Sequence, residues 1–445
     1  MPTLLPRPPG RPGFGGDRRR GRPRPAVLRR AAATCIALAL AMAGPGGNAW
    51  GGLPTGPAAG DMDLSPFYRW DGPLPAEPGV LLRQETLPAQ PGTGAAAAVV
   101  RILYTSTDAR WHSGRIAVSG TLFLPSGTPP RGGWPLLAWA HGTLGIADAC
   151  APSWTGFRPR DATYLDRWLA AGFAVVATDY QGLGGPGPHP YLHWPSEGRS
   201  VLDAARAALL ARPGLVSNRT LVAGQSQGAG AALGAGRLAR EYAPELNVLG
   251  VAATGLNSTF PDGPVPLPAR DTPNMFLSLA SGGLRDDAPP IDRLLSPKGR
   301  QLLEAARQGC TKELGMLARK LEVRGLPDTL SVSLEGLAPM RMPLTDMPVG
   351  AIGVPVLVGT GLADQTIPPM RQYAAVAALC AASGDITWRR YDGLGHDGAL
   401  HGSFDDTLGF ARSLLAGRKP QGNCATVSPP GPPGERREDA PFNDD

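Results

Sequence analysis

The hydrophobic pattern of this 445-residue chain changes near Trp134. From there, short continuous apolar runs alternate with segments whose apolar positions recur at helical spacing. Continuous apolar strands joined by helices are typical of a parallel sheet that is covered on both faces. The expected strands are residues 136–140, 173–178, 221–223, 248–253, 354–358 and 386–391, and the expected helices are residues 164–171, 197–211, 228–242, 369–382 and 403–415.

Two further strand-like runs come before this region, at residues 98–105 and 115–124. Polar residues and glycine separate them, which predicts an antiparallel hairpin. Between residues 256 and 349 the alternation stops, and the apolar residues fall into four short helical patterns, at residues 277–284, 291–295, 302–306 and 314–321. About ninety residues without a strand, inside an alternating fold, indicate an inserted helical cap.

The two ends of the chain have a different composition. Residues 50–93 are rich in proline and glycine, and residues 419–445 combine proline, glycine and charge, with Cys424 as the one expected anchor. We therefore expect an N-terminal extension at 50–93, a main α/β domain formed by 94–255 and 350–418, the cap at 256–349, and a mostly disordered tail from 419 onward.

The positive charge of the chain is concentrated in its first 49 residues. This segment holds nine arginines and one acid, Asp17, whereas the remainder has 34 basic and 36 acidic residues, a net charge of about −2. Nucleic-acid binding needs a cationic face on the folded part, so we expect no nucleic-acid partner. A basic stretch, the apolar run 31–43 and the small residues before position 50 form the layout of an export signal, and the run is too short for an ordinary membrane span.

Four cysteines remain after this leader, namely Cys150, Cys310, Cys380 and Cys424. Their spacing contains no Cys-x-x-Cys pair, so we expect no metal site. An even number of cysteines in an exported chain fits two disulfides. Spacing alone leaves all three pairings open.

The strongest motif is Gly224-Gln225-Ser226-Gln227-Gly228. It fits Gly-x-Ser-x-Gly, with an expected strand before it and an expected helix after it. In that setting the serine occupies a tight strand–turn–helix elbow, and the helix N-terminus favours developing negative charge. We therefore expect Ser226 to be a nucleophile and not an ordinary helix-capping serine.

A serine hydroxyl needs a general base, and the base needs a carboxylate that orients it. His396 follows the last expected strand, and Asp364 follows the strand before it, so both should reach the sheet edge where Ser226 lies. This order, Ser then Asp then His, is the one found in α/β-hydrolases. His401 is the alternative base, while Asp392 and Asp397 are weaker alternatives because each lies close to His396 in sequence.

Acyl transfer also needs donors for the oxyanion. The residue after the nucleophile usually gives one backbone N–H group, which here belongs to Gln227. The second donor comes from the loop after the 136–140 strand, where His141-Gly142-Thr143 stands. We assign this second role to the backbone of Thr143, although the glycine could simply turn the chain.

With these residues assembled, the chain resembles the secretory lipase family from about residue 66 to residue 424. The resemblance implies an α/β-hydrolase fold with a helical cap, ester or acylglycerol hydrolysis, no cofactor, and the disulfides Cys150–Cys310 and Cys380–Cys424. Ala229 departs from the second glycine that many relatives carry after the elbow. The segments that carry the resemblance are Ala140-His141-Gly142-Thr143, Cys150-Ala151-Pro152-Ser153, Asp179-Tyr180-Gln181-Gly182, Ser196-Glu197-Gly198, the Ser226 elbow, Tyr242-Ala243-Pro244-Glu245-Leu246, Ala363-Asp364 and Gly395-His396.

The expected protein is thus a secreted hydrolase that acts on a small-molecule or lipid ester through Ser226, without stable membrane insertion. The alternatives with the same triad are a short-chain carboxylesterase, an acyltransferase or a peptidase. An alternative of another class is a non-catalytic, hydrolase-like binding protein.

Overall fold

The computed structural model describes residues 64–257, 276–277, 279–281, 291–333, 350–383 and 385–443. The expected export signal lies outside the described residues, as do residues 50–63 of the expected extension and large parts of the expected cap.

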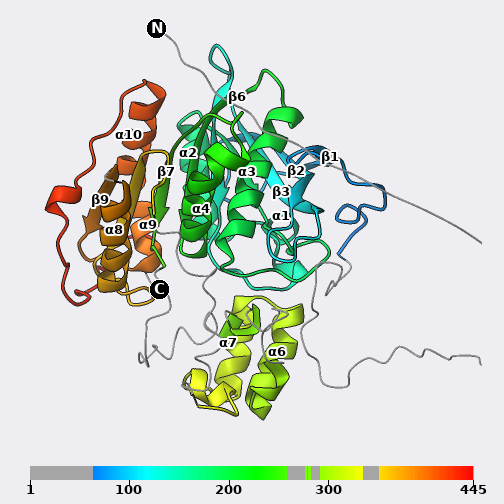
Figure 1. The fold of residues 1–445 in the computed structure, drawn as a ribbon, viewed down its shortest axis with the longest axis vertical. Helices are drawn as coiled ribbons and strands as arrows, with labels where there is room; N and C mark the ends of the chain where they lie inside the picture. Colours follow the sequence, from blue (N-terminus) through cyan, green and yellow to red (C-terminus); the bar gives the residue numbers. More distant parts are fainter. Residues whose placement is uncertain are drawn as a thin grey trace, which may run out of the picture. The chain divides into compact units, whose positions relative to one another are not determined.

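One mixed sheet of nine strands forms the centre of the described part, in the order β1-β2-β3-β5-β4-β6-β7-β8-β9 (Figure 1). Strands β1, β2, β3 and β5 pair antiparallel in that order. The rest of the sheet, β5-β4-β6-β7-β8-β9, is parallel throughout. The predicted hairpin is the β2–β3 pair. The strands are β1 (Leu81–Leu87), β2 (Ala96–Thr107), β3 (Arg115–Pro125), β4 (Trp134–Ala140), β5 (Ala174–Thr178), β6 (Val216–Gln225), β7 (Val248–Thr254), β8 (Val356–Gly361) and β9 (Ile386–Tyr391).

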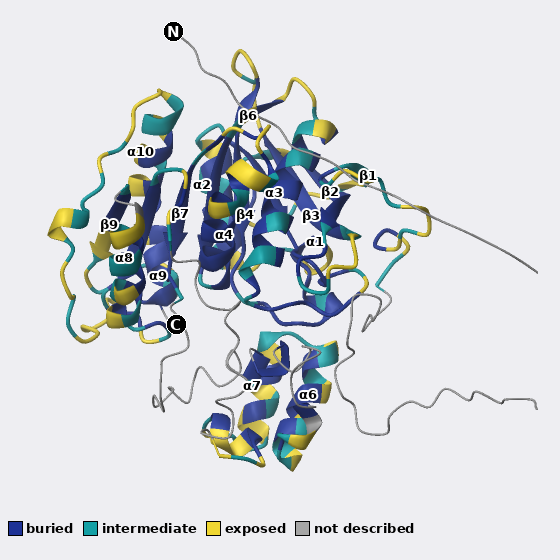
Figure 2. Cartoon of the chain, in the orientation of Figure 1, coloured by how far each residue is buried: buried dark blue, intermediate teal, exposed yellow. Residues whose placement is uncertain are grey.

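Helices cover both faces of this sheet because its strands present apolar side chains in both directions. Along β4, Leu136 and Ala138 join one buried cluster, and Leu137 and Trp139 join the other. The first cluster includes residues of the helices α3 (Trp194–Ala211), α4 (Gln227–Tyr242) and α8 (Pro369–Ser383). The second includes residues of α2 (Pro159–Ala170), α9 (His396–Gly402) and α10 (Phe404–Leu415). Figure 2 shows the central strands as largely buried between these helices. The predicted α/β-hydrolase fold class is confirmed.

The helices near the sheet agree with the sequence pattern to within a few residues at most ends. The helix Pro159–Ala170 starts five residues earlier than expected and Trp194–Ala211 starts three residues earlier, and His396–Gly402 is an additional short helix. The α-helices are α1 (Pro152–Thr155), α2 (Pro159–Ala170), α3 (Trp194–Ala211), α4 (Gln227–Tyr242), α6 (Pro297–Gln308), α7 (Thr311–Lys320), α8 (Pro369–Ser383), α9 (His396–Gly402) and α10 (Phe404–Leu415).

The described part of the cap belongs to a small apolar cluster that it shares with the main domain. Helices α6 and α7 pack together, and residues 276–277 and 279–281 are also helical. The buried side chains of Phe276, Leu277 and Leu302 belong to one cluster, which also contains Ile146 and Tyr191 from the main domain. The disulfide Cys150–Cys310 and the hydrogen bond from Thr311 N to Leu144 O (2.8 Å) join α7 to the segment after β4.

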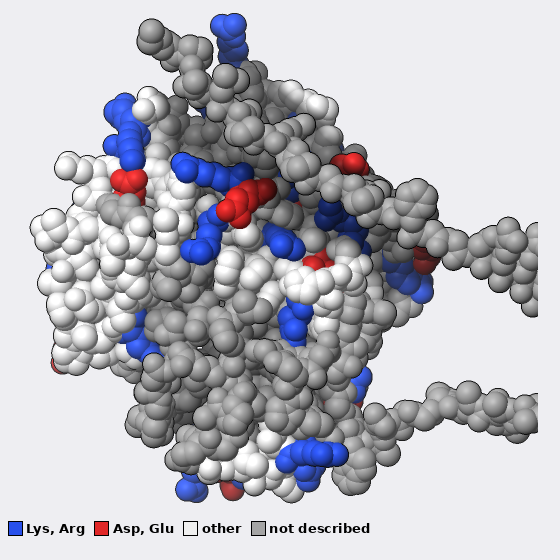
Figure 3. Space-filling view, in the orientation of Figure 1, with Lys and Arg blue, Asp and Glu red and all other residues white. Residues whose placement is uncertain are grey.

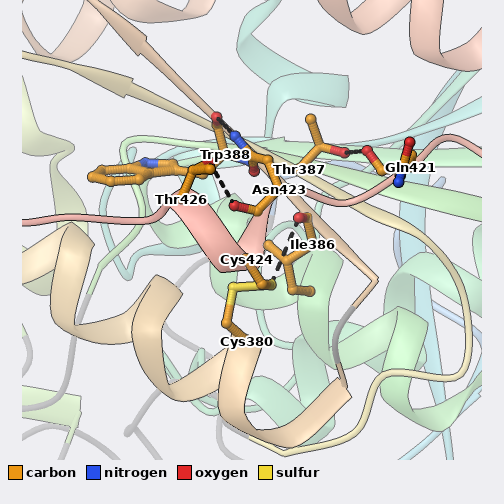
Figure 4. Close-up of a disulfide and its surroundings, with 8 residues drawn as sticks. All are labelled: Cys380, Ile386, Thr387, Trp388, Gln421, Asn423, Cys424 and Thr426. Atoms are coloured by element: carbon orange, nitrogen blue, oxygen red, sulfur yellow. Dashed lines mark hydrogen bonds between the residues drawn. A yellow bond between two sulfur atoms is a disulfide. The ribbon is translucent and has the colours of Figure 1, made fainter.

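Two parts of the chain differ from the expected domain limits. β1 lies within residues 50–93, so the expected extension contributes an edge strand to the sheet. The expected disordered tail has specific contacts along residues 419–443, including the disulfide Cys380–Cys424. Figure 4 shows how the amide of Asn423 pairs with the backbone of Trp388 next to this disulfide. Hydrogen bonds and a covalent link order this segment despite its low apolar content.

Candidate active site

Ser226 occupies the turn between β6, which ends at Gln225, and α4, which begins at Gln227. Its backbone has φ 58° and ψ −119°, in the left-handed half of the map, where a residue other than glycine is strained by about 1–3 kcal/mol. The Ser226 N–H donates to the carbonyl of Thr254 at the end of β7 (2.9 Å), which helps to hold this conformation. The turn therefore has the geometry of a nucleophile elbow.

The glycines of the motif are required by close packing. A Cβ atom on Gly224 would overlap the carbonyl of Gly228, and a Cβ atom on Gly228 would overlap the carbonyl of Ala140 in β4. Because backbone atoms cause both overlaps, a side-chain rotation could not relieve them. The Gly-x-Ser-x-Gly pattern thus allows α4 to start directly against β4.

Asp364 follows β8 by three residues, and its side chain is fully buried. One carboxylate oxygen accepts the backbone N–H groups of Thr366 (2.9 Å) and Ile367 (2.8 Å). The other accepts the amide Nε2 of Gln372 (2.8 Å) and lies 2.8 Å from the imidazole Nδ1 of His396. This set of donors fixes the carboxylate and allows it to select the tautomer of His396 that carries a proton on Nδ1.

His396 is the first residue of α9 and is also buried, with 5% of its surface exposed. A Cβ atom on Gly255 would lie 2.6 Å from Cε1 and 3.0 Å from Nδ1 of this imidazole. Gly255 follows Thr254, whose carbonyl holds the Ser226 N–H. The imidazole therefore lies against the end of β7, the strand next to the one that ends in the elbow.

The alternative acid and base residues have other partners. The ring of His401 makes a hydrogen bond through Nε2 to the carbonyl of Arg160 (3.1 Å), and burial lowers its pKa to about 4. Asp397 forms an ion pair with Arg160. Burial alone would raise the pKa of Asp397, but the charges of Arg160 and His396 lower it below its ordinary value. Asp392 is exposed.

The two expected oxyanion residues lie at the ends of neighbouring parallel strands, since Thr143 follows β4 and Gln227 follows β6. The hydroxyl of Thr143 shares a hydrogen bond with the hydroxyl of Tyr191 (2.7 Å). The buried side chain of Gln227 donates through Nε2 to Oε1 of Glu197 (2.7 Å) and lies 2.9 Å from Nε2 of His189. Both residues are thus held by side chains from residues 189–197.

Glu197 is a buried acid to which the sequence assigned no role. Burial raises its pKa to about 8, and burial lowers the pKa of His189 to about 3, so both groups are mostly neutral at pH 7. A neutral His189 that donates from Nδ1 to the carbonyl of Gln181 (2.8 Å) can accept the Gln227 amide at Nε2. The available signal was Ser196-Glu197-Gly198 at the start of a helix, but burial of the acid cannot be read from it.

Within the described residues, no cluster of three or more His, Cys, Asp or Glu side chains could hold a metal ion. No helix in the same part of the chain is long and apolar enough to cross a membrane. On the face drawn in Figure 3, the basic and acidic side chains of the described residues are scattered among uncharged ones.

A family model described as Secretory lipase matches residues 155–264, which include the Ser226 elbow. The fold is similar to that of Candida antarctica lipase A in its closed state, with a TM-score of 0.64 and 22% sequence identity, over 82% of this chain and 89% of that chain. It is also similar to the ligand-bound rice cell wall degrading esterase LipA from Xanthomonas oryzae, with a TM-score of 0.60 and 19% identity, over 77% of this chain and 100% of that chain.

A putative hydrolase from Legionella pneumophila is a third structure of this kind, with a TM-score of 0.57 and 16% identity, over 75% of this chain and 98% of that chain. Among curated proteins, no sequence matches the chain significantly. At these identities, the solved structures establish the fold alone. The family match and the fold together confirm that the chain resembles the secretory lipases, and they support a carboxylic ester hydrolase.

Proposed function

We propose that this protein is a secreted serine hydrolase that cleaves carboxylic esters of the lipase type through an acyl-enzyme. The observation that carries the proposal is the 2.8 Å contact between His396 Nδ1 and Asp364 Oδ2, beside a strained Ser226 elbow. The three residues follow β9, β8 and β6, whose carboxyl ends meet at one edge of the parallel sheet. An oriented imidazole beside the strained elbow of a serine is the arrangement that nucleophilic acyl transfer needs.

In the proposed reaction, the Nε2 atom of His396 accepts the hydroxyl proton of Ser226 while Oγ attacks the ester carbonyl. The backbone N–H groups of Gln227 and Thr143 stabilise the oxyanion of the tetrahedral intermediate. His396, now a cation held by Asp364, gives its proton to the leaving alcohol. Water then attacks the acyl-enzyme by the same path, which releases the acid and restores Ser226.

The direct test of this assignment is Ser226→Ala. The variant should fold normally, as judged by circular dichroism, and lose about a millionfold in hydrolysis of p-nitrophenyl esters. If the folded variant kept a tenth of the wild-type activity, the nucleophile would lie elsewhere. Adding an alcohol as a competing acyl acceptor in the same assay separates hydrolysis from acyl transfer. Replacing the ester substrate by an amide tests for peptidase activity.

A short-chain carboxylesterase is a second candidate function, which the packing of the described part of the cap favours. A cap that lines an acyl pocket needs apolar side chains beyond those of its own core. Phe276 and Leu277 have no exposed surface, and Leu279 has 8%, all within the cluster of the cap. A series of p-nitrophenyl esters from acetate to palmitate decides between the two. A rise in kcat/KM with chain length indicates a lipase, and a preference for acetate or butyrate indicates an esterase.

Export is the remaining part of the proposal. Two disulfides, Cys150–Cys310 and Cys380–Cys424, are typical of proteins from oxidising compartments. The leader has the charge and hydropathy of an export signal, with a small-residue site before residue 50. N-terminal sequencing of protein recovered from the culture medium should therefore start close to Trp50. Recovery of an uncleaved chain from the cytoplasm alone would contradict this part of the proposal.

A further inference from the structure

The C-terminal segment runs from the start of β9 to the loop that precedes His396. Asn423 and Cys424 attach its beginning to β9 and α8 (Figure 4). Further along, the Gly434 N–H donates to the carbonyl of Leu362, two residues before Asp364, and the Arg437 N–H donates to the carbonyl of Gly393 (both 2.8 Å). The segment thus contacts the loops of both proposed catalytic partners.

Among these contacts, those of Asn443 reach the residue directly before His396. Only 4% of the Asn443 surface is exposed. Its Oδ1 atom accepts the backbone N–H of Gly395 (2.6 Å), and its Nδ2 atom donates to the carbonyls of Gly393 (2.9 Å) and Arg437 (2.6 Å). One planar amide therefore joins both ends of the turn that precedes His396. A buried side chain in this place must offer an acceptor and two donors at once, which an asparagine does and an aspartate or alanine does not.

The neighbouring residues fit closely around this amide. A Cβ atom on Gly398, in the first turn of α9, would overlap the Asn443 side chain. The ring of Phe442 stacks on His401, with 4.5 Å between the ring centroids and 24° between the planes. Phe442 has φ 53°, a conformation that a bulky residue adopts only where its surroundings hold it. The contact is therefore specific to this geometry and not a loose apposition of a tail.

The turn itself needs such support. Gly393-Leu394-Gly395 joins β9 to α9, and Gly393 has φ 68°. Glycines leave a turn many accessible conformations. The position of His396 therefore depends on contacts that residues outside the turn make with it. A displacement of about 1 Å in a catalytic group can cost about a hundredfold in rate.

We propose that Asn443 is a positioning residue for the reaction, which clamps the Gly393–Gly395 turn so that His396 stays aligned with Asp364 and Ser226. This inference rests on the proposed function of His396 as the general base. It assigns a role in the chemistry to a segment that its composition marks as a disordered tail. Asn443 itself touches neither the substrate nor the reacting atoms.

The test compares Asn443→Ala with Asn423→Ala in the full chain. Asn423 is a matched control, because its amide also bridges backbone groups, accepting from Trp388 N (2.7 Å) and donating to Trp388 O (3.0 Å), but at β9 and away from the His396 turn. Both variants should melt at a lower temperature than the wild type. Only Asn443→Ala should lose kcat, by about ten- to a hundredfold per folded molecule, with KM changed less than threefold.

A kcat for Asn443→Ala within twofold of that of Asn423→Ala would overturn the inference and leave Asn443 a merely structural residue. If the alanine variant does not fold, Asn443→Asp replaces it, since the carboxylate keeps the acceptor for Gly395 but lacks both donors. The same loss of kcat is expected there, and an unchanged kcat overturns the inference. If the wild type and Ser226→Ala hydrolyse esters equally, the proposed function fails, which is a different result.

Discussion

The imidazole Nδ1 of His396 lies 2.8 Å from the carboxylate Oδ2 of Asp364, although 32 residues separate them in sequence. The carboxylate also accepts two backbone N–H groups and one side-chain amide, so its position does not depend on the histidine. Because the fixed carboxylate orients the imidazole, His396 can pass a proton between a serine and a leaving group without first reorganising.

The first prediction concerns this pair. Asp364→Asn should lower kcat by about ten-thousandfold, because the amide would favour the wrong tautomer of His396 while filling the same space. The control is Asp392→Asn, which changes an exposed acid four residues before His396 and should leave kcat within twofold. If the two variants lost activity equally, Asp364 would not be the orienting acid.

The second prediction separates the two histidines of α9. His396→Ala should be nearly inactive, whereas His401→Phe should keep at least a tenth of the wild-type kcat. The phenyl ring can preserve the stacking on Phe442, and the imidazole of His401 already bonds to the carbonyl of Arg160. Steady-state kinetics on one soluble ester is sufficient. An inactive His401→Phe beside an active His396→Ala would move the base to His401.

The third prediction concerns Glu197 and the pH dependence of stability. Burial raises the pKa of Glu197 from 4.5 to about 8. Between these values the folded protein keeps the proton while the unfolded chain releases it, so the contribution of Glu197 to stability falls as the pH rises from about 4.5 to about 8.

In the wild type, Glu197 Oε1 accepts the side-chain amide of Gln227 (2.7 Å) and the backbone N–H of Leu192 (3.0 Å). Glu197→Gln removes the ionisation but keeps an oxygen that can accept from both. Relative to the wild type, the variant should therefore gain stability progressively over that pH range, as measured by urea unfolding at several pH values. Glu241→Gln, on the exposed side of α4, serves as the control and should show no such trend. A constant difference between wild type and Glu197→Gln from pH 5 to pH 8 would refute the assignment of a buried, neutral acid.

The fourth prediction concerns the disulfides, which close loops of 160 and 44 residues. In the loop-entropy model, each adds about 3–5 kcal/mol to the free energy of unfolding. Replacing Cys380 and Cys424 by serine should lower stability and also loosen the attachment of the C-terminal segment. Peptide mapping under non-reducing conditions checks the pairing first, and free thiols in the exported protein would contradict it.

The sequence predicted the central sheet and the order of the site residues because both depend on local patterns. Continuous apolar runs mark buried parallel strands, and the glycines around Ser226 mark a turn that no larger residue permits. β1 was missed because its side chains are mostly half-buried or exposed, which leaves a weak alternation along Leu81–Leu87.

The C-terminal segment was predicted as disordered for a related physical reason. Its order comes from a disulfide and from single amides such as Asn423 and Asn443, which pair with backbone groups far away in sequence. Composition registers apolar content and charge, and neither reports such pairings. The roles of Glu197 and His189 were likewise hidden, because they depend on burial and on contact with Gln227 across the fold.

The measurement that tests the central claim most directly is covalent labelling with a fluorophosphonate probe, followed by mass spectrometry of the labelled peptide. We expect one label per molecule, on Ser226, with loss of ester hydrolysis in proportion to labelling. His396→Ala should fold and label at least a thousandfold more slowly, because the serine would lack its base. A label on another residue, or a folded wild-type protein that hydrolyses esters and takes up no label, would contradict the account.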